Sequence, residues 1–273
     1  MRGVYQVCCA ISLTVGALAL AQGAAEDRVS VAFSDPARPG LLKAHVMNGG
    51  ITVKGYQGRE VIIEARLRDR ESTRTEGPRS EGMKRLNLTS TGLSVEEENN
   101  VMSVGASTMA RAVDLNIQVP VRTSLKLSTL NDGNVKVEQI SGELEINCLN
   151  GSVTLTNISG SVVAHALNGP MVATLNKVDP KPMSFSSMNG NIDVTFPPDI
   201  RANLKMRTDM GDIYSDFDVK MGDSPKAVTE DSRNKSGRYR VHIDKTIYGT
   251  INGGGPEIQF KNFNGSIYVR KGK

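Results

Sequence analysis

The stretch LNGSVTLTNISGSVVAHALNG, residues 149–169, contains Gly151, Gly160 and Gly169, each nine positions after the previous one. Written in blocks of nine from Gly133, the chain reads GNVKVEQIS, GELEINCLN, GSVTLTNIS, GSVVAHALN and GPMVATLNK. Glycine supplies only 27 of the 273 residues. Successive glycines at a fixed step therefore indicate an internal repeat rather than coincidence.

Each block predicts one short strand and one corner. Positions three and five are apolar in every block, and this alternation is typical of a strand with one buried face. Asn-Gly and Ser-Gly pairs tolerate positive φ, so the backbone can turn between the strands. The corners alternate between Asn-Gly or Asp-Gly (Gly133, Gly151, Gly169) and Ser-Gly (Gly142, Gly160). The larger unit is therefore a pair of blocks, with two strands and two corners.

The same phase recurs outside this block, as NGGITV at 48–53, NGNIDV at 189–194, NGSIYV at 264–269 and a degenerate MGDIYS at 210–215. The step widens after Gly169, to Gly190 and then Gly211, and prolines at 180, 182, 197 and 198 lie where the wider corners are expected. The further turn residues predicted in this way are Asn48, Gly49, Asn150, Asn168, Asn189, Gly190, Gly211, Asn252, Gly253, Asn264 and Gly265. Gly253 is included because it follows Gly211 at twice the wider step.

These features predict an all-β protein, a β-solenoid over residues 119–273 with a polar insertion at 220–238. Stacked coils would bury apolar columns and align Asn side chains along the corners, where they can pair. A β-sandwich of hairpins is the rival, because Asn-Gly is also a strong hairpin signal. Residues 26–118 contain less regular strand patterns, among them REVIIEARLRDR at 59–70, and are expected to cap the open end of the solenoid.

Residues 1–25 have the three parts of a secretory signal peptide. One positive charge at Arg2 precedes an uncharged apolar run from Val7 to Leu20, and cleavage is expected after Ala21, or otherwise after Ala25. The run is shorter than the roughly 20 residues of a membrane-spanning helix, so no stable span is expected after cleavage. Only Cys148 then remains, which excludes an internal disulfide. The small positive net charge is spread along the chain, which argues against nucleic acid as a partner.

Two segments resemble a known family. The run VPVRTSLKLSTLNDGNVKVEQISGELEINCLNGSVTLTNISGSVVAHALNG at 119–169 and the ending INGGGPEIQFKNFNGSIYVRKG at 251–272 are similar to the bacterial DUF4097 family of adhesin-type β-repeat proteins. The resemblance extends over most of the chain after the signal segment and implies a secreted or envelope-located protein. The chain departs from the pattern at NDGN (131–134), NGPM (168–171) and DMGD (209–212), where the Asn-Gly turn is broken or followed by Pro.

Patterns of catalytic and metal-binding residues are missing from the sequence. His45, His165 and His242 are far apart, and HExxH, CxxC and GxSxG do not occur. Position six of the blocks contains no aspartate, unlike the repeats of calcium-binding rolls. We therefore expect no cofactor, no metal and no enzymatic activity. A polysaccharide-active enzyme is the enzymatic alternative, with Glu143, Asp193 and Asp212 as its candidate carboxylates.

One aromatic pair is the best candidate for a contact surface. Tyr214 and Tyr268 share position four of their repeats, which is expected to point outward, in a chain with no Trp. The sequence therefore favours an exported, non-enzymatic protein, a monomer that binds a protein or glycan of the cell envelope as an adhesin or scaffold. A periplasmic accessory or envelope-stress sensing protein is the alternative. The sequence leaves the periplasm, the cell surface and the medium open as locations.

Overall fold

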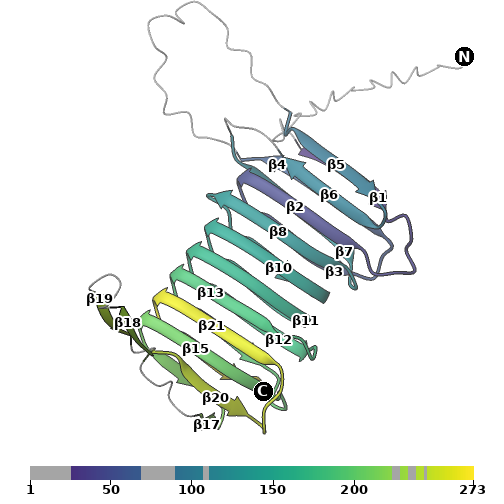
Figure 1. The fold of residues 1–273 in the computed structure, drawn as a ribbon. Coiled ribbons are helices and arrows are strands. Elements are labelled where there is room, and N and C mark those ends of the chain that lie inside the picture. Colours follow the sequence, from purple (N-terminus) through teal and green to yellow (C-terminus); the bar gives the residue numbers. More distant parts are fainter. Residues whose placement is uncertain (1–25, 69–89, 107–110, 223–227, 233–237, 243–244) are drawn as a thin grey trace, which may run out of the picture.

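All the regular elements in the described part of the chain are β-strands. The computed structural model describes residues 26–68, 90–106, 111–222, 228–232, 238–242 and 245–273. The predicted signal segment 1–25 lies outside these residues, as do the last two residues of the strand expected at 59–70 and the charged residues 71–85 that follow it. Figure 1 shows the strands as a flattened solenoid whose coils stack from the N-terminal to the C-terminal end. The predicted all-β solenoid is confirmed.

Two faces make up the solenoid. In spatial order, face A contains β5 (Leu93–Glu98), β6 (Val101–Ala106), β2 (Leu41–Asn48), β8 (Ser124–Asn131), β10 (Ser141–Asn150), the second half of β11 (Val153–Asn168), β13 (Met183–Asn189), β21 (Glu257–Asn264), β15 (Ala202–Met210), β20 (Ile247–Ile251) and β17 (Lys220–Met221). Face B contains β1 (Glu26–Ala32), β4 (Glu60–Leu67), β7 (Val113–Pro120), β3 (Ile51–Tyr56), β9 (Val135–Glu138), the first half of β11, β12 (Met171–Val178), β14 (Ile192–Phe196), β22 (Ile267–Lys271) and β16 (Ile213–Ser215). Within the predicted insertion and just after it, β18 (Val228–Ser232) and β19 (Arg238–His242) form a separate antiparallel pair.

The two strands that flank each Asn-Gly corner belong to opposite faces. β10 pairs in parallel with β8 and β11, and the strand that follows its corner pairs in parallel with β9 and β12. A hairpin would instead pair the two flanking strands with each other, antiparallel. The rival interpretation, a sandwich of hairpins, is therefore wrong for the repeat.

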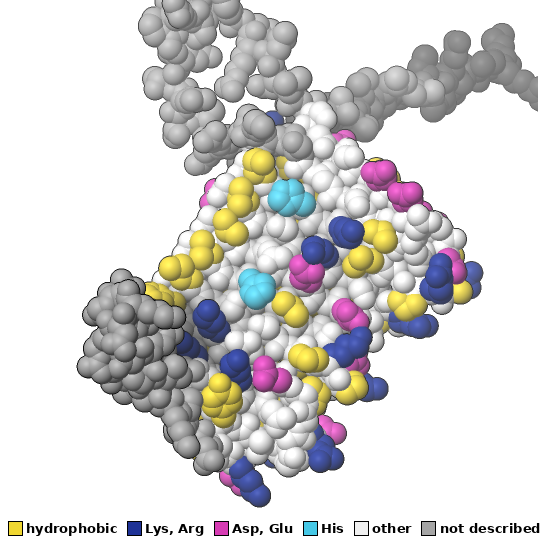
Figure 2. All heavy atoms as spheres, in the orientation of Figure 1, with side chains coloured by type: hydrophobic (Ala, Val, Ile, Leu, Met, Phe, Trp, Pro, Cys, Tyr) yellow, Lys and Arg dark blue, Asp and Glu magenta, His cyan; other side chains and the backbone are white. Residues whose placement is uncertain are grey.

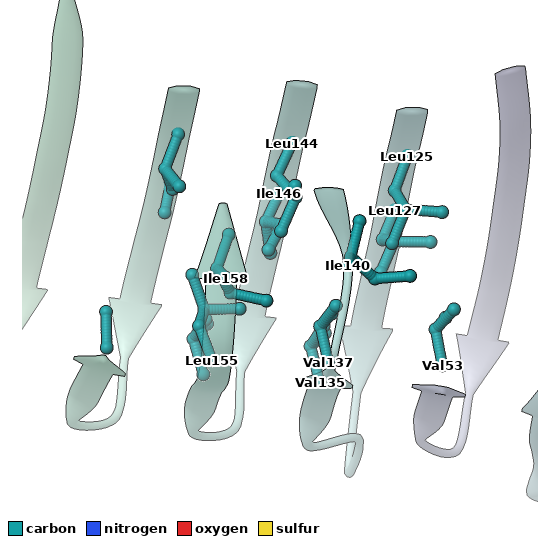
Figure 3. Packing of buried hydrophobic residues seen from close by; sticks show 14 of the residues in the cluster. Val53, Leu125, Leu127, Val135, Val137, Ile140, Leu144, Ile146, Leu155 and Ile158 are labelled. Carbon is teal, nitrogen blue, oxygen red and sulfur yellow. The ribbon is translucent and has the colours of Figure 1, made fainter. Parts of the chain in front are cut away.

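Alternating apolar residues fill the space between the faces. Figure 3 shows Leu144 and Ile146 of face A pointing toward Val135, Val137 and Leu155 of face B. All five side chains are buried, within a single apolar cluster that extends along the described solenoid. Burial of such side chains contributes about 1.5–3 kcal/mol each. Because the neighbouring coils provide much of this burial, every coil depends on them for its stability.

The spatial order of the coils differs from their order in the sequence. β2 and β3 lie between the coils of β6–β7 and β8–β9, and β21 and β22 lie between those of β13–β14 and β15–β16. In Figure 1 these insertions appear as breaks in the colour sequence, with yellow β21 between β13 and β15. The expectation that Gly253 continues the wider step is wrong, because Gly253 follows β20, which pairs antiparallel with β15 and β17. Asn252 and Gly253 form the turn from β20 into β21, at the opposite ends of the strands from the Asn-Gly corners.

Antiparallel strands cover the ends of the stack. At the N-terminal end β1, β4 and β5 pair antiparallel with their neighbours. At the C-terminal end β20 and β17 do the same on face A, and Phe217 is buried in the core cluster. β7 runs across positions 118 and 119 and belongs to the same core as the repeat. The structure thus places no break at the boundary drawn from the sequence.

Candidate functional site

The Asn-Gly corners form one long edge, called here the Asn-Gly edge. Its glycines stack in the spatial order Gly49, Gly133, Gly151, Gly169, Gly190, Gly265 and Gly211. Gly169 has φ 146°, and a Cβ there would lie 2.2 Å from the carbonyl oxygen of Gly151. The missing side chain therefore lets adjacent corners approach closely enough for the Gly169 N–H to donate to the Asn189 carbonyl at 2.8 Å.

A ladder of side-chain amides accompanies the glycines. Asn168 Nδ2 donates to Asn150 Oδ1 and Asn189 Nδ2 donates to Asn168 Oδ1, both at 2.8 Å. Asn131 joins the ladder by donating to Asn48 and accepting from Asn150, each at 3.3 Å. The predicted pairing of corner asparagines is confirmed. The sequence departures at NDGN and NGPM leave the ladder intact, since Asn131 and Asn168 both belong to it.

The opposite edge, called the Ser-Gly edge, is built differently. Gln139 (φ 58°) and Asn157 (φ 56°) adopt the left-handed conformation, three residues ahead of Gly142 and Gly160. β11 passes through this corner as one continuous strand of 16 residues. The prediction that every nonapeptide ends its strand at a glycine corner is therefore wrong for this edge, because the left-handed residue bends the chain without interrupting the strand.

The predicted tyrosine pair comes together on face B. Tyr214 of β16 and Tyr268 of β22 are cross-strand neighbours whose rings stack with centroids 5.1 Å apart and planes 10° apart. Tyr214 is 51% exposed. The guanidinium carbon of Arg270 lies 5.3 Å from the centre of the Tyr268 ring, in cation–π range. One face of the Tyr214 ring stacks on Tyr268. The other face, on the last strand of face B, is the free face of the stack.

Charged groups surround this stack. Arg270 Nε donates to Asp193 Oδ1 at 2.7 Å, on the strand next to β22. The Tyr214 hydroxyl donates to Asp212 Oδ2 at 3.3 Å, and the negative charge of Asp212 raises the pKa of Tyr214. We call Tyr214, Tyr268, Arg270 and Asp193 the tyrosine patch. Its chemistry, an aromatic surface beside a guanidinium and a carboxylate, suits contact with a polar ligand that has flat apolar faces.

Two candidate carboxylates of the enzymatic alternative, Glu143 and Asp193, lie on opposite faces. Glu143 lies on face A, where it forms an ion pair with Lys181, whereas Asp193 lies on face B and is bound to Arg270. Within the part of the chain that the structure describes, no group of three or more His, Cys, Asp or Glu residues is arranged to hold a metal ion. Glu143 and Asp193 therefore do not form the carboxylate pair of a glycoside hydrolase.

A second surface feature escaped the sequence analysis. An apolar residue precedes the corner asparagine, or the Asn-Asp of one corner, in six successive coils and points outward from face A. These residues form what we call the apolar stripe: Met47, Leu130, Leu149, Leu167, Met188 and Phe263. Leu130 is half-buried and the other five are 39–46% exposed. Figure 2 shows apolar side chains in a row along this margin of the molecule.

The available signal was an apolar residue directly before each corner asparagine, as in MNG, LNG and FNG. Position eight is apolar in the first four blocks, yet Ile140 and Ile158 are buried while Leu149 and Leu167 are exposed. The left-handed residue before Ile140 and Ile158 turns them inward. On the Asn-Gly edge the ordinary alternation continues and turns position eight outward.

A groove of about 660 Å³ lies along the stripe on face A. Leu149, Leu167, Met188 and Phe263 supply its apolar lining, and His165, Arg207, Asp209 and Lys261 are among its polar residues. The Arg207 guanidinium and the Asp209 carboxylate form an ion pair at 2.9 Å. Its volume is within the range of small-molecule sites, about 300–1,000 Å³.

The two histidines whose side chains the structure describes, His45 and His165, do not share a site. His165 shares a hydrogen bond with the Ser186 hydroxyl, and His45 lies in the same outward column of face A, three strands away. The side chain of His242, in β19, lies outside the described residues. Cys148 is buried against the carbonyls of Gly133 and Gly151, and burial raises the pKa of its thiol.

The structure is thus a β-solenoid with stacked glycines along its Asn-Gly edge, an exposed pair of tyrosines on face B and an exposed apolar stripe on face A. A family model described as Toastrack DUF4097 matches residues 44–252, and the chain belongs to this family. No curated protein matches the chain significantly.

Two solved crystal structures are similar to this chain. A "putative cell adhesion protein" from Clostridium sporogenes has 11% sequence identity and a TM-score of 0.50, over 90% of this chain and all of that one. A "putative adhesin" from Bacteroides fragilis has 11% identity and a TM-score of 0.31, over 90% of this chain and 96% of that one. At these identities the first likeness supports the fold alone. Among the described residues no helix is both long and apolar enough to cross a membrane.

Proposed function

We propose that this protein is an exported, non-enzymatic binding protein of the bacterial cell envelope, and that the tyrosine patch contacts its ligand. The observation that carries the proposal is the exposed stack of Tyr214 on Tyr268 beside the Arg270–Asp193 ion pair. Two aligned tyrosines expose apolar surface that a solvated strand face does not need. The adhesin names of the similar structures agree with such a role.

The class of ligand that suits the patch is a glycan. Sugar rings combine an apolar C–H face with hydroxyl groups at their rims. The free face of the Tyr214 ring can cover the C–H face, and the Asp193 carboxylate and Arg270 guanidinium can accept from and donate to hydroxyls. β14 and β22 have parallel neighbours on both sides, which hold Asp193, Tyr268 and Arg270 in place, so these residues lose little conformational entropy when the ligand binds.

The test is binding of the full chain to immobilised envelope glycan, with a double variant, Tyr214→Ala with Tyr268→Ala. We expect at least about a tenfold loss of affinity, because the double variant removes the exposed Tyr214 ring and the Tyr268 ring on which it stacks. Tyr248→Ala is the matched control, since Tyr248 is a partly exposed tyrosine on face A. Undiminished binding by the double variant would reject the tyrosine patch.

Location requires a second measurement. Protease treatment of intact cells that produce the protein with a C-terminal tag distinguishes the cell surface from the periplasm. Loss of the tag without lysis supports the adhesin role. Protection until the outer envelope is opened would contradict it and would favour a periplasmic accessory protein.

A further inference from the structure

The apolar stripe is long, straight and one side chain wide. Neighbouring strands lie about 4.8 Å apart, so its six residues extend over about 24 Å. The ladder of corner asparagines borders it on one side. On the other side lies the outward column of polar residues from the same strands, His45, Ser128, Asn147, His165, Ser186 and Lys261.

In the outward column beside the stripe, the one Lys, Arg, Asp or Glu is Lys261, at the Phe263 end. The coils that supply Leu149, Leu167 and Met188 place Asn147, His165 and Ser186 beside it. At the coil of Phe263 the neighbouring residue is Lys261, and the next strand adds Arg207 and Asp209, which form their own ion pair. Lys261 forms no ion pair with any of the residues that the structure describes. The groove therefore combines a neutral apolar row with a cationic end.

The width of the stripe distinguishes among occupants. An α-helix with its side chains is about 10–12 Å across, so its flanks would rest on the polar columns and cover them. A second copy of the chain would bury one row of half-covered side chains, well under the about 800 Å² per partner of a stable interface. A single hydrocarbon chain covers the row and leaves the polar columns in water.

We propose that the apolar stripe binds the hydrocarbon chain of a single-chain anionic amphiphile, with the acid group held by Lys261. Met and Leu side chains suit this role because they adapt to a flexible chain. A carboxylate or phosphate at the cationic end would accept a charge-assisted hydrogen bond from the Lys261 ammonium. This site lies on face A and is independent of the tyrosine patch on face B.

Titration of the full chain with sodium palmitate, below the concentration at which it forms micelles, tests the proposal by calorimetry. We expect saturable binding of one palmitate per chain. Leu167→Ser with Met188→Ser should weaken it at least about tenfold, because a polar group replaces apolar contact at two rungs. Val172→Ser is the matched control, because Val172 is equally exposed but lies on face B, and it should bind like the parent.

The acid group is tested with Lys261→Gln, which should weaken palmitate binding about fivefold or more and leave the binding of neutral hexadecanol unchanged. All the substituted side chains are at least partly exposed, so equal melting temperatures verify that the variants fold. The Tyr214→Ala, Tyr268→Ala protein should retain palmitate binding, so failure of one proposal does not imply failure of the other.

Several results would overturn the proposal. These are the absence of saturable palmitate binding, the same loss in Val172→Ser as in the stripe variant, or no effect of Lys261→Gln. Binding to phosphatidylglycerol vesicles, but not to dispersed palmitate, would identify a membrane surface instead. A dimer in sedimentation velocity that the stripe variant dissociates would identify a second copy as the occupant.

Discussion

The Asn-Gly edge and the Ser-Gly edge turn the same chain between the same two faces, yet they obey different constraints. On the Asn-Gly edge seven glycines stack on one another and no Cβ can be accommodated between corners. On the Ser-Gly edge the connections vary, from the continuous strand β11 to the proline-containing segments 179–182 and 197–201. One edge therefore determines the spacing of the coils, and the other absorbs variation in sequence and length.

This difference also explains where the apolar stripe lies. A residue directly before the corner asparagine keeps the same register in every coil, because the Asn-Gly edge keeps the corners aligned. Side chains beside the Ser-Gly edge enter corners of different lengths and cannot form an equally long row. The close stacking of corners at the Asn-Gly edge is therefore what aligns the apolar stripe in a straight row.

The largest expected effect is that of Gly169→Ala. The new Cβ would lie 2.2 Å from a backbone carbonyl oxygen, at a φ of 146° that is strained for alanine. We expect a loss of at least about 3 kcal/mol in the free energy of unfolding, measured by chemical denaturation. Gly105→Ala is the control, because a Cβ on Gly105 meets nothing within 4 Å, and its stability should change by less than about 0.5 kcal/mol. Equal effects of the two substitutions would show that the edge is not sterically constrained.

Asn168→Ala should have the next largest effect. It removes one side-chain hydrogen bond to Asn150 and one from Asn189. Because each of the two bonds contributes about 0.5–1.5 kcal/mol, we expect a loss of about 1–3 kcal/mol, measured by the same denaturation.

Asn157→Gly, on the Ser-Gly edge, is the counterpart of this substitution. Asn157 has φ 56°, which glycine adopts freely. The free energy of unfolding should change by less than about 0.5 kcal/mol. A larger loss here than for Asn168→Ala would reverse the comparison of the edges.

Lengthening the chain should have a small effect on stability at the Ser-Gly edge and a larger one at the Asn-Gly edge. Two glycines inserted after Pro180, in the connection from β12 to β13, should cost at most about 0.6 kcal/mol, because loop-closure entropy grows slowly with length. The same insertion between Asn168 and Gly169 should shift the corner out of its stack and unfold the chain at a clearly lower temperature. Thermal melting of the two variants provides the comparison, and similar melting temperatures would contradict it.

The strands and corners of the repeat could be predicted from the sequence because they depend on residues close together in the chain. The alternation of Val153 and Leu155 and the glycine after each corner asparagine follow from strand and turn chemistry within one coil. The order of the coils could not be predicted, because β21 would pair equally well in register with several neighbours. Which gap it fills depends on where the long connection after β16 brings it back.

The tyrosine patch and the apolar stripe also differ in how far the sequence predicts them. Tyr214 and Tyr268 were recognised because they occupy the same repeat position, and the structure brings them into one stack. The apolar stripe was overlooked because Leu149 and Ile158 occupy the same position eight. The left-handed Asn157 turns Ile158 inward on the Ser-Gly edge. No such residue precedes Leu149 on the Asn-Gly edge, and Leu149 points outward.

The smallest expected effect is on the pH dependence of stability, which should differ between the two edges. At the start of the face A strands, on the Ser-Gly side, Glu97 accepts hydrogen bonds from the Ser34 hydroxyl and from the backbone N–H groups of Ser34 and Asn100. The Ser34 hydroxyl contributes most to lowering the pKa of Glu97. A carboxyl whose pKa is lower in the folded state stabilises the fold above its unfolded pKa and loses this contribution as the pH falls through the folded value. The amide ladder of the Asn-Gly edge contains no group that titrates.

Glu97→Gln therefore lowers the melting temperature at pH 7 relative to the parent, and the difference should be smaller near pH 3, because the contribution is lost as the pH falls below the ordinary glutamate pKa and through the lowered one. The Asn168→Ala difference should remain at both pH values, because amide hydrogen bonds do not depend on protonation. Melting curves of the three proteins at the two pH values measure this. If the effect of Glu97→Gln persisted undiminished in acid, it would come from packing rather than charge, and the two edges would not differ in their response to pH.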